Sequence, residues 1–339
     1  MSFTKFKRWF AILACAALGG ACMDYGPYEV EDFGITGSGL FITNEGNFMY
    51  GNASLSYYDP EKKQVENEIF FRANGFKLGD VAQSMVIRDG IGWIVVNNSG
   101  VIYAIDIDTF KEVGRIEGFT SPRYIHFLSD TKAYVTDLFS PYLTVFDPRT
   151  CKITGAIHTG QAPSTGSYNS TEQMAQYGKW VFVNCWSYSN KILVIDSEQD
   201  KVVHEIELRS IQPNSLVVDR NGKLWALTDG GYAGSEYGQT EPCLYRIDAA
   251  TWRVEQEFVF EKEEYPSELC INGAGDVLYF INDGICKMSV TAAHAPTRPL
   301  IPNQKNCLIY GLAIDPTNGE IYVGDAIDFE QPGVVYRYR

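Results

Sequence analysis

The chain has 339 residues and a formal net charge of −14, with 21% charged and 14% aromatic side chains. An acidic surface of this strength repels nucleic acid and anionic lipid, so we expect neither as a partner. The aromatic content is sufficient for a large β core. One domain can extend over most of such a length when the fold grows by adding repeated units.

The N-terminus has the parts of a secretory signal. Three basic residues within positions 5–8 precede an apolar run, Trp9 to Leu18, and small residues lead up to Cys22. The apolar run is too short to span a membrane and fits a signal peptide. The small residues resemble a bacterial lipobox. We therefore predict a signal peptide over residues 1–21 and lipidation at Cys22, with secretion without a lipid as the alternative.

Residues 22–38 are predicted to be an acidic linker, with carboxylates at Asp24, Glu29, Glu31 and Asp32. Acidic residues just after a lipid-bearing cysteine resemble the export tag that sends lipoproteins to the cell surface in some Gram-negative gut anaerobes. An ordinary solvated linker is the alternative. Removal of the signal peptide takes away three positive charges and changes the net charge from −14 to −17. We expect an outer-membrane protein, exposed at the cell surface, that touches the membrane through its lipid anchor only.

Residues 39–339 repeat one short phrase seven times, in which apolar or aromatic residues are followed by Asn or Asp. The copies are 40–44, 93–97, 133–137, 180–184, 225–229, 278–282 and 321–325. Their spacing stays near the roughly 40–50 residues of one propeller blade. Seven copies predict an all-β, seven-bladed propeller in a single domain.

The remaining parts of the repeat complete a four-stranded antiparallel blade. A strand that ends in Asp follows the phrase, as at Asp106 and Asp248, and Thr stands three residues later in these copies. Asp and Thr at a strand end bond to the local backbone and set a tight turn. Asn-Gly and Asp-Gly turns precede several of the phrases. The phrase is therefore strand B of strands A to D, and no helical pattern of useful length is present.

The B–C and D–A loops share one face of such a propeller, here called the upper face. They are longer than the A–B and C–D loops and richer in aromatic and amide residues, which together suit a large ligand with polar edges or a glycan. Candidate ligand-binding residues are Asn47, Tyr50, Phe76, Asn98, Arg123, Tyr142, Trp186, Tyr188, Asn214, Tyr232, Tyr237 and Asp325. Arg123 either donates to a ligand or pairs with a neighbouring carboxylate.

Several of these patterns also have purely structural readings. The Asn or Asp at the end of each phrase caps the B–C turn, lines the mouth of the central channel, or does both. Trp93, Trp180 and Trp225 lie within strand B and are expected in the core between blades. The six cysteines after Cys22 lack metal-like spacing, and we expect buried free thiols.

Evidence for catalysis or a cofactor is thin. The four histidines are scattered, and no nucleophile elbow, zinc-binding H-E-x-x-H motif or phosphate-binding loop is present. Carboxylates at the channel mouth, namely Asp137, Asp229, Asp283 and Asp325, are weak candidates for Ca²⁺ because residues from separate blades give no spacing signature. We therefore predict no enzyme, no cofactor and no metal.

The phrase Ala133-Tyr-Val-Thr-Asp137 resembles the YVTN-type repeat of YncE-like propellers. The segments 39–47, 52–59, 76–84 and 170–173, together with the lipobox, resemble the BtuG-like surface lipoproteins of vitamin B12 uptake. That resemblance implies capture of cobalamin or a related corrinoid on the upper face. It also implies transfer of the ligand to a TonB-dependent outer-membrane transporter.

The two ends of the repeat array depart from a closed propeller. The first unit begins at strand B and the last stops after strand C, at 334–338. Either residues 25–35 fill one gap or the chain is shortened, and we favour shortening. We expect a seam between the first and last blades that lacks full strand pairing.

Three functions follow from these patterns. The first is a cell-surface corrinoid-binding protein. The second is a protein-interaction propeller that acts as a lid or scaffold for uptake of another nutrient. The third is an enzyme acting on a glycan or lactone, which would need clustered carboxylates with a histidine or a metal ion.

Overall fold

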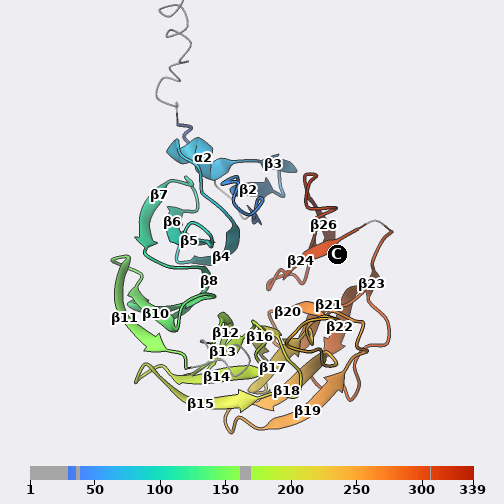
Figure 1. Ribbon diagram of the computed structural model, residues 1–339. Helices are drawn as coiled ribbons and strands as arrows, with labels where there is room; N and C mark the ends of the chain where they lie inside the picture. Colours follow the sequence, from blue (N-terminus) through green and yellow to red (C-terminus); the bar gives the residue numbers. More distant parts are fainter. Residues whose placement is uncertain (1–29, 36–38, 161–168, 306) are drawn as a thin grey trace, which may run out of the picture.

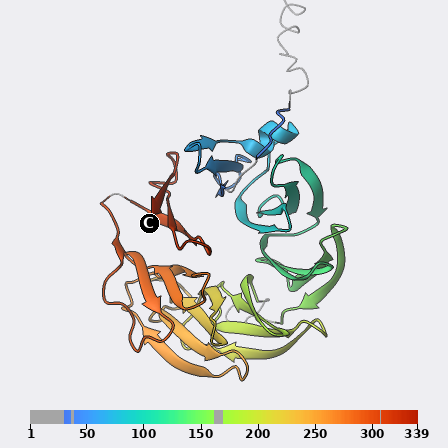
Figure 2. The same ribbon diagram turned by 180° about the vertical axis from the view of Figure 1, so that it is seen from behind.

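The computed structural model describes residues 30–35, 39–160, 169–305 and 307–339. Seven antiparallel sheets follow one another around a ring, as Figure 1 shows from one side and Figure 2 from the other. The predicted all-β, seven-bladed propeller is confirmed. The ring arrangement matters for function because it gathers loops from all seven blades on each of its two faces.

The sheets are numbered as blades 1 to 7 in chain order. Blade 1 contains β1 (Leu40–Asn44), β2 (Ser54–Asp59) and β3 (Gln64–Glu66), and blade 2 contains β4 (Ala82–Arg88), β5 (Ile91–Val96), β6 (Val101–Asp106) and β7 (Glu112–Glu117). Blade 3 contains β8 (Pro122–Ser129), β9 (Lys132–Asp137), β10 (Tyr142–Asp147) and β11 (Lys152–His158). Blade 4 contains β12 (Thr171–Tyr177), β13 (Trp180–Cys185), β14 (Lys191–Asp196) and β15 (Lys201–Glu207).

Blade 5 contains β16 (Pro213–Val218), β17 (Lys223–Thr228), β18 (Cys243–Asp248) and β19 (Val254–Val259). Blade 6 contains β20 (Ser267–Ile271), β21 (Val277–Ile281), β22 (Gly284–Ser289) and β23 (Ile301–Pro302). Blade 7 contains β24 (Ile309–Ile314), β25 (Ile321–Asp325) and β26 (Val334–Tyr338). The seven repeated phrases fall on or at the end of β1, β5, β9, β13, β17, β21 and β25, so each occupies strand B as predicted.

The predicted Asp turns close the hairpins between strands C and D. Asp106 Oδ1 accepts hydrogen bonds from the backbone N–H of Thr109 at 2.8 Å and from the Thr109 hydroxyl at 2.8 Å. Asp248 makes the same two contacts with Thr251. The Thr109 bonds lower the pKa of Asp106, and the Lys223 ammonium, followed by the Thr251 bonds, lowers the pKa of Asp248. The side chains at the strand ends therefore set the tight turns of the lower face.

The core lies between neighbouring blades. Trp93 of blade 2 packs against Phe127 and Phe146 of blade 3, with ring centroids 5.7 and 5.6 Å away. Trp225 is fully buried in a cluster that joins blades 5 and 6. Trp180 lies 5.2 Å from Trp252 of blade 5 but stays half-buried. The expected inter-blade role is confirmed for Trp93 and Trp225 and only partly for Trp180.

One short helix, α2 (Ile69–Asn74), interrupts the D–A loop between blades 1 and 2 and was not predicted. It ends at Gly75, which adopts the left-handed conformation that favours glycine, and the Gly75 N–H bonds to the Phe71 carbonyl. Its buried residues are Ile69, Phe70 and Ala73. A helix of this length shows too few turns to give a recognisable hydrophobic period.

Residues 30–35, expected as part of a linker, pack against blades 1 and 2. The Phe33 ring lies 5.0 Å from Phe110, and Arg72 forms an ion pair with Glu31 at 2.7 Å. The backbone N–H of Ile35 bonds to the Asp108 carbonyl. This segment therefore does not pair with the free edge of β1. The remaining residues of 25–35 and the predicted lipidation site Cys22 lie outside the described residues.

The expected seam is present between blades 1 and 7. Both blades have three strands, and no described strand pairs with the inner edge of β1 or the outer edge of β26. A side-chain hydrogen bond crosses the seam, from the Tyr310 hydroxyl to Glu45 Oε2 at 3.0 Å. Figures 1 and 2 show the ends of the array facing each other without a shared sheet.

The six cysteines after Cys22 are free thiols, and Cys185, Cys243 and Cys286 are buried. Cys151, Cys270 and Cys307 are only half-buried, which corrects the expectation that all six are buried. Burial raises the pKa of Cys286 to about 11, so its thiol stays protonated at neutral pH. None of the helices in the described ranges has the length and apolar character needed to cross a membrane.

Candidate functional site

The inner strands of blades 2 to 7 share a local irregularity. Figure 1 places β4, β8, β12, β16, β20 and β24 nearest the axis of the ring. Each contains one extra residue near its start relative to strand B, which forms a β-bulge. The second residues of these strands are Gln83, Arg123, Glu172, Asn214, Glu268 and Tyr310. All six have polar groups, and we call them the channel ring.

Arg123 is held by its neighbours in the channel ring. Its Nε lies 2.8 Å from Glu172 Oε1 and donates a hydrogen bond to Glu172 Oε2 at 2.9 Å. Its Nη1 donates to Gln83 Oε1. Glu172 is only 4% exposed, so the ion pair is largely removed from water. Of the two readings offered by the sequence, the structure shows pairing with a neighbouring carboxylate.

The carboxyls at this mouth of the channel are crowded. Burial raises the pKa of Glu45 and of Glu172. It also raises the pKa of Glu268 to about 7, with additional repulsion from Glu45 and Glu172. Glu268 holds a backbone φ of 56°, which non-glycine residues seldom adopt. Near neutral pH, Glu268 therefore carries a proton part of the time.

Three tyrosines from two different B–C loops meet beside the channel ring. The Tyr188 ring stacks on Tyr237 at a centroid distance of 4.3 Å, and the Tyr188 hydroxyl donates to the Tyr232 hydroxyl at 3.1 Å. That hydrogen bond, with burial, raises the pKa of Tyr188 to about 12. Tyr232 and Tyr237 remain 52% and 39% exposed. We call these three residues the tyrosine cluster.

A hydrogen-bonded group of side chains lies between blades 4 and 5. Burial raises the pKa of Asp229, while hydrogen bonds from the Gly231 N–H, Trp186 and Asn214 oppose this rise. The Trp186 backbone N–H bonds to the Ser170 carbonyl, and Asn214 Nδ2 bonds to the Pro266 carbonyl at 2.9 Å. Five predicted site residues, namely Trp186, Tyr188, Asn214, Tyr232 and Tyr237, thus come together over blades 4 and 5.

Other predicted residues lie elsewhere on the molecule. Asn47 and Tyr50 belong to the exposed loop after β1, and Tyr50 is 75% exposed. Asn98 donates to Asp80 Oδ2, and Tyr142 is 46% exposed and contacts the His158 ring at 5.4 Å.

Two predicted residues have mainly structural contacts. Phe76 is half-buried against Phe70 and Tyr103, with ring centroids 5.2 and 6.1 Å away. Asp325 accepts hydrogen bonds from the backbone N–H groups of Leu308 and Ile327.

Among the residues that end strand B, the aspartates Asp137, Asp229 and Asp325 cap the adjacent loops, as one of the two readings predicted. The asparagines bond elsewhere, as Asn44 does to the Ser54 and Ser56 hydroxyls of β2. Asp137 accepts backbone hydrogen bonds from Thr120, Ser121 and Phe139. Asn97 reaches the next blade, where Nδ2 donates to the Pro122 carbonyl at 3.0 Å. The described residues contain no group of three or more His, Cys, Asp or Glu side chains placed to hold a metal ion.

Exposed aromatic side chains gather on the upper face. Of the ten exposed Phe and Tyr side chains in the described residues, nine lie in or beside B–C and D–A loops. They are Phe48, Tyr50, Phe139, Tyr142, Tyr232, Tyr237, Tyr265, Tyr310 and Phe329. The tenth, Tyr177, lies at an A–B turn on the opposite face. Concentration of exposed aromatic surface on one face is a common feature of binding surfaces.

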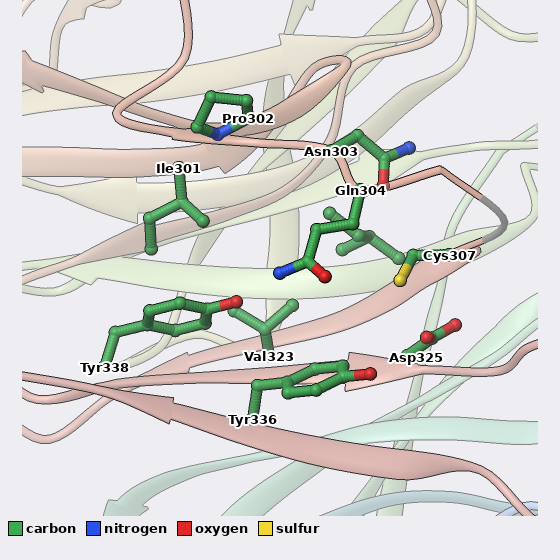
Figure 3. Close-up of a pocket in the computed structure, with 10 residues that line it drawn as sticks. Ile301, Pro302, Asn303, Gln304, Cys307, Val323, Asp325, Tyr336 and Tyr338 are labelled. Atoms are coloured by element: carbon green, nitrogen blue, oxygen red, sulfur yellow. The ribbon is translucent and has the colours of Figure 1, made fainter.

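Two small pockets in the described part of the chain lie away from the tyrosine cluster. One lies between blades 6 and 7, where Figure 3 shows Tyr338 beside Ile301. The second is lined by residues that include Asn52 and Phe70. Neither pocket includes a residue of the tyrosine cluster.

Sequence reasoning missed Glu45, Gln83, Glu172, Glu268 and Tyr310. The signal was available as a polar side chain at the second position of every inner strand, but it emerges only when the repeats are aligned on strand A. The segments that carry the family resemblance include Glu45, Gln83 and Glu172.

Solved structures with the same fold belong to proteins of different kinds. A quinoprotein alcohol dehydrogenase-like protein from Bacteroides thetaiotaomicron has a TM-score of 0.66 at 15% identity, over 87% of this chain and 73% of that one. BamB from Moraxella catarrhalis has a TM-score of 0.56 at 13% identity, over 91% and 83% of the two chains. A streptogramin B lyase has a TM-score of 0.58 at 13% identity, over 76% and 82%.

At these identities the likeness extends to the fold alone. No curated protein matches the chain. A family profile matches residues 38–329, which include nearly the whole propeller, and the chain therefore belongs to the family described as Domain of unknown function (DUF5074).

Proposed function

We propose that this protein is a non-catalytic binding protein that captures a large ligand on the upper face of its propeller. The observation that carries the proposal is the concentration of exposed aromatic side chains on that face. Aromatic rings offer rigid apolar area at low entropic cost, and tyrosine adds a hydrogen-bonding tip. The leading ligand is cobalamin or a related corrinoid.

The chemistry of the face supports a corrinoid. A corrin is a wide apolar ring with amide groups along its rim. The tyrosine cluster supplies exposed ring surface, and Trp186, Asn214 and Asp229 supply polar groups beside it. The resemblance to BtuG-like lipoproteins in segments 39–47, 52–59, 76–84 and 170–173 supports the same ligand.

Location and partner form the second part of the proposal. The signal peptide and the lipobox before Cys22 support a lipid-anchored protein at the outer membrane, and the family resemblance supports transfer of the ligand to a TonB-dependent transporter. Metabolic labelling with a palmitate analogue tests the anchor. Label should enter the wild-type protein and not Cys22→Ser, and equal labelling of both would contradict the anchor.

Calorimetric titration of the purified protein with cyanocobalamin tests the binding function. We expect one-to-one binding that Tyr237→Ala weakens at least fivefold, because stacking surface is lost. Tyr177→Ala is the matched control, since Tyr177 and Tyr237 are both 39% exposed and lie on opposite faces. Absence of binding by the folded wild-type protein, or equal weakening by both variants, would refute corrinoid capture on this face.

A protein-interaction role is the second candidate, and the exposure of Tyr232 and Tyr237 favours it, because exposed aromatic patches also mark protein-docking surfaces. Affinity capture with Tyr237→Ala as the negative control, performed without corrinoid, separates this role from ligand capture.

A further inference from the structure

Two polar side chains between blades 4 and 5 are buried without a hydrogen-bond partner in the described part of the chain. Ser189 is 2% exposed and its Oγ is unpaired, and Gln212 is 7% exposed and its Oε1 is unpaired. A buried polar group left unpaired costs about 1–3 kcal/mol. A fold seldom keeps such groups without a use for them, so the pair needs an explanation.

The two residues are neighbours across the junction of two loops. The Gln212 backbone N–H bonds to the Ser189 carbonyl at 2.8 Å. Ser189 follows Tyr188 of the tyrosine cluster, and Gln212 precedes Pro213, whose carbonyl accepts a hydrogen bond from Asn184. Gln212 also adopts a left-handed backbone, with φ of 57°. The pair therefore lies directly beside the proposed binding face.

The long B–C loop of blade 5 lies against Gln212. A Cβ placed on Gly231 would lie 3.1 Å from Gln212 Oε1, so the loop backbone rests on that oxygen. Gly230 and Gly231 at the start of the loop both have φ of 76°, a left-handed conformation that glycine adopts without strain. Toward the tip, Tyr232 and Tyr237 hold the loop to blade 4 through Tyr188.

The exposed rings of this loop belong to the proposed binding face. A ligand that contacts them therefore contacts the loop that lies against Gln212. Exposure of Gln212 Oε1 requires movement about Gly230 and Gly231 and loss of the hydrogen bonds from the Gly230 N–H to the Ile211 carbonyl and from the Thr240 N–H to the Gly230 carbonyl. The unpaired groups below are one acceptor, Gln212 Oε1, and one hydroxyl, which can donate or accept.

We propose that Ser189 and Gln212 form a recognition site for a primary carboxamide of the ligand, beneath residues 230–241. The ligand N–H donates to Gln212 Oε1, and the ligand C=O accepts from the Ser189 hydroxyl. A carboxylate has no N–H to offer and is further repelled by Asp229. The inference rests on the proposed function and specifies the ligand class at the same face.

Two corrinoid probes separate this inference from the proposed function. Dicyanocobinamide retains the side-chain carboxamides, whereas cobyrinic acid has carboxylates in their place. We expect the full-length protein to bind cobinamide at least tenfold more tightly, both in 0.15 M and in 1 M NaCl. High salt screens general repulsion from the acidic surface but leaves a local hydrogen-bond preference. Equal affinities, or a preference lost in 1 M salt, would overturn the inference alone. Binding of cyanocobalamin but of neither probe would overturn the inference alone, and binding of none of the three would overturn the proposed function and this inference together.

A pair of substitutions tests the residue assignment. In Gln212→Leu the unpaired acceptor is replaced by an apolar group of similar size, so Tm should stay or rise while cobinamide affinity falls about tenfold. Gln176→Leu is the control, because Gln176 is paired with His126 at 2.9 Å and with the Gly178 carbonyl at 2.7 Å on the opposite face. It should lower Tm and leave affinity unchanged. A Gln212→Leu variant that loses Tm, or that binds as the wild type does, would overturn the assignment.

Discussion

Neutralising Glu268 should stabilise the protein in a pH-dependent way. The ordinary pKa of this carboxyl is 4.5, and burial with repulsion from Glu45 and Glu172 raises it to about 7. Between these two values the folded state keeps a proton that the unfolded state has released, so stability is lost as the pH rises from 4.5 to 7. Each pKa unit corresponds to about 1.4 kcal/mol, which gives about 3 kcal/mol at most above pH 7. Because Glu268 is half-buried, solvent screening reduces this to about 2 kcal/mol.

Glu268→Gln removes the titration while keeping the shape of the side chain. Urea unfolding at pH 5 and pH 8 should show the variant about 2 kcal/mol more stable than the wild type at pH 8 and nearly equal to it at pH 5. The difference between the two proteins is the observable, since other carboxyls with lowered pKa, such as Asp248, act in the opposite direction in both. Glu263→Gln, on an exposed glutamate of the preceding loop, is the control. The same stability difference at both pH values would refute the reasoning.

Three further substitutions test contacts of the fold. Arg123→Ala should lower the free energy of unfolding in urea by about 3–5 kcal/mol, because Glu172 is left as an uncompensated buried charge. The double variant Arg123→Ala, Glu172→Ala should recover much of this loss. An equal loss in the single and the double variant would contradict the pairing. Asp137→Ala should lower unfolding free energy by about 1–3 kcal/mol, since backbone N–H groups lose their acceptor, and an unchanged value would exclude the capping role. Tyr310→Phe should speed hydrogen exchange in β1 and β24 and cost about 1 kcal/mol, whereas unchanged exchange would mean that the bond to Glu45 does not hold the seam.

The sequence was sufficient for the propeller because the signal repeats. Each copy of the phrase at strand B has its own strand pattern, as at Ala133 to Asp137, and its unit has its own turn, as at Asp106 to Thr109. These local signals alone predict seven blades. Helix α2 was not predicted because six residues are too few to show a helical period of apolar residues. Phe76 was placed on the binding face, whereas α2 and Tyr103 enclose it on one side.

The site was less predictable, because its parts come from separate repeats. Tyr188 and Tyr237 lie almost fifty positions apart, and only the neighbouring arrangement of blades 4 and 5 brings their rings into contact. The pairing of Arg123 with Glu172 depends in the same way on adjacent inner strands. The loop in which a residue lies predicts the face of the propeller that it occupies. Which side chain of the next blade it contacts depends on strand register and β-bulges, which no local sequence pattern encodes.

The seam makes the ring mechanically an arc with two free ends. In a closed ring, any displacement of one blade is shared by all the others through continuous contact. In an arc, the ends move most and the middle moves least. Tyr188, Tyr232 and Tyr237 lie between the fourth and fifth of seven blades, with complete four-stranded sheets on both sides. Displacement of blades 1 and 7 relative to each other should therefore leave the geometry of the tyrosine cluster nearly unchanged.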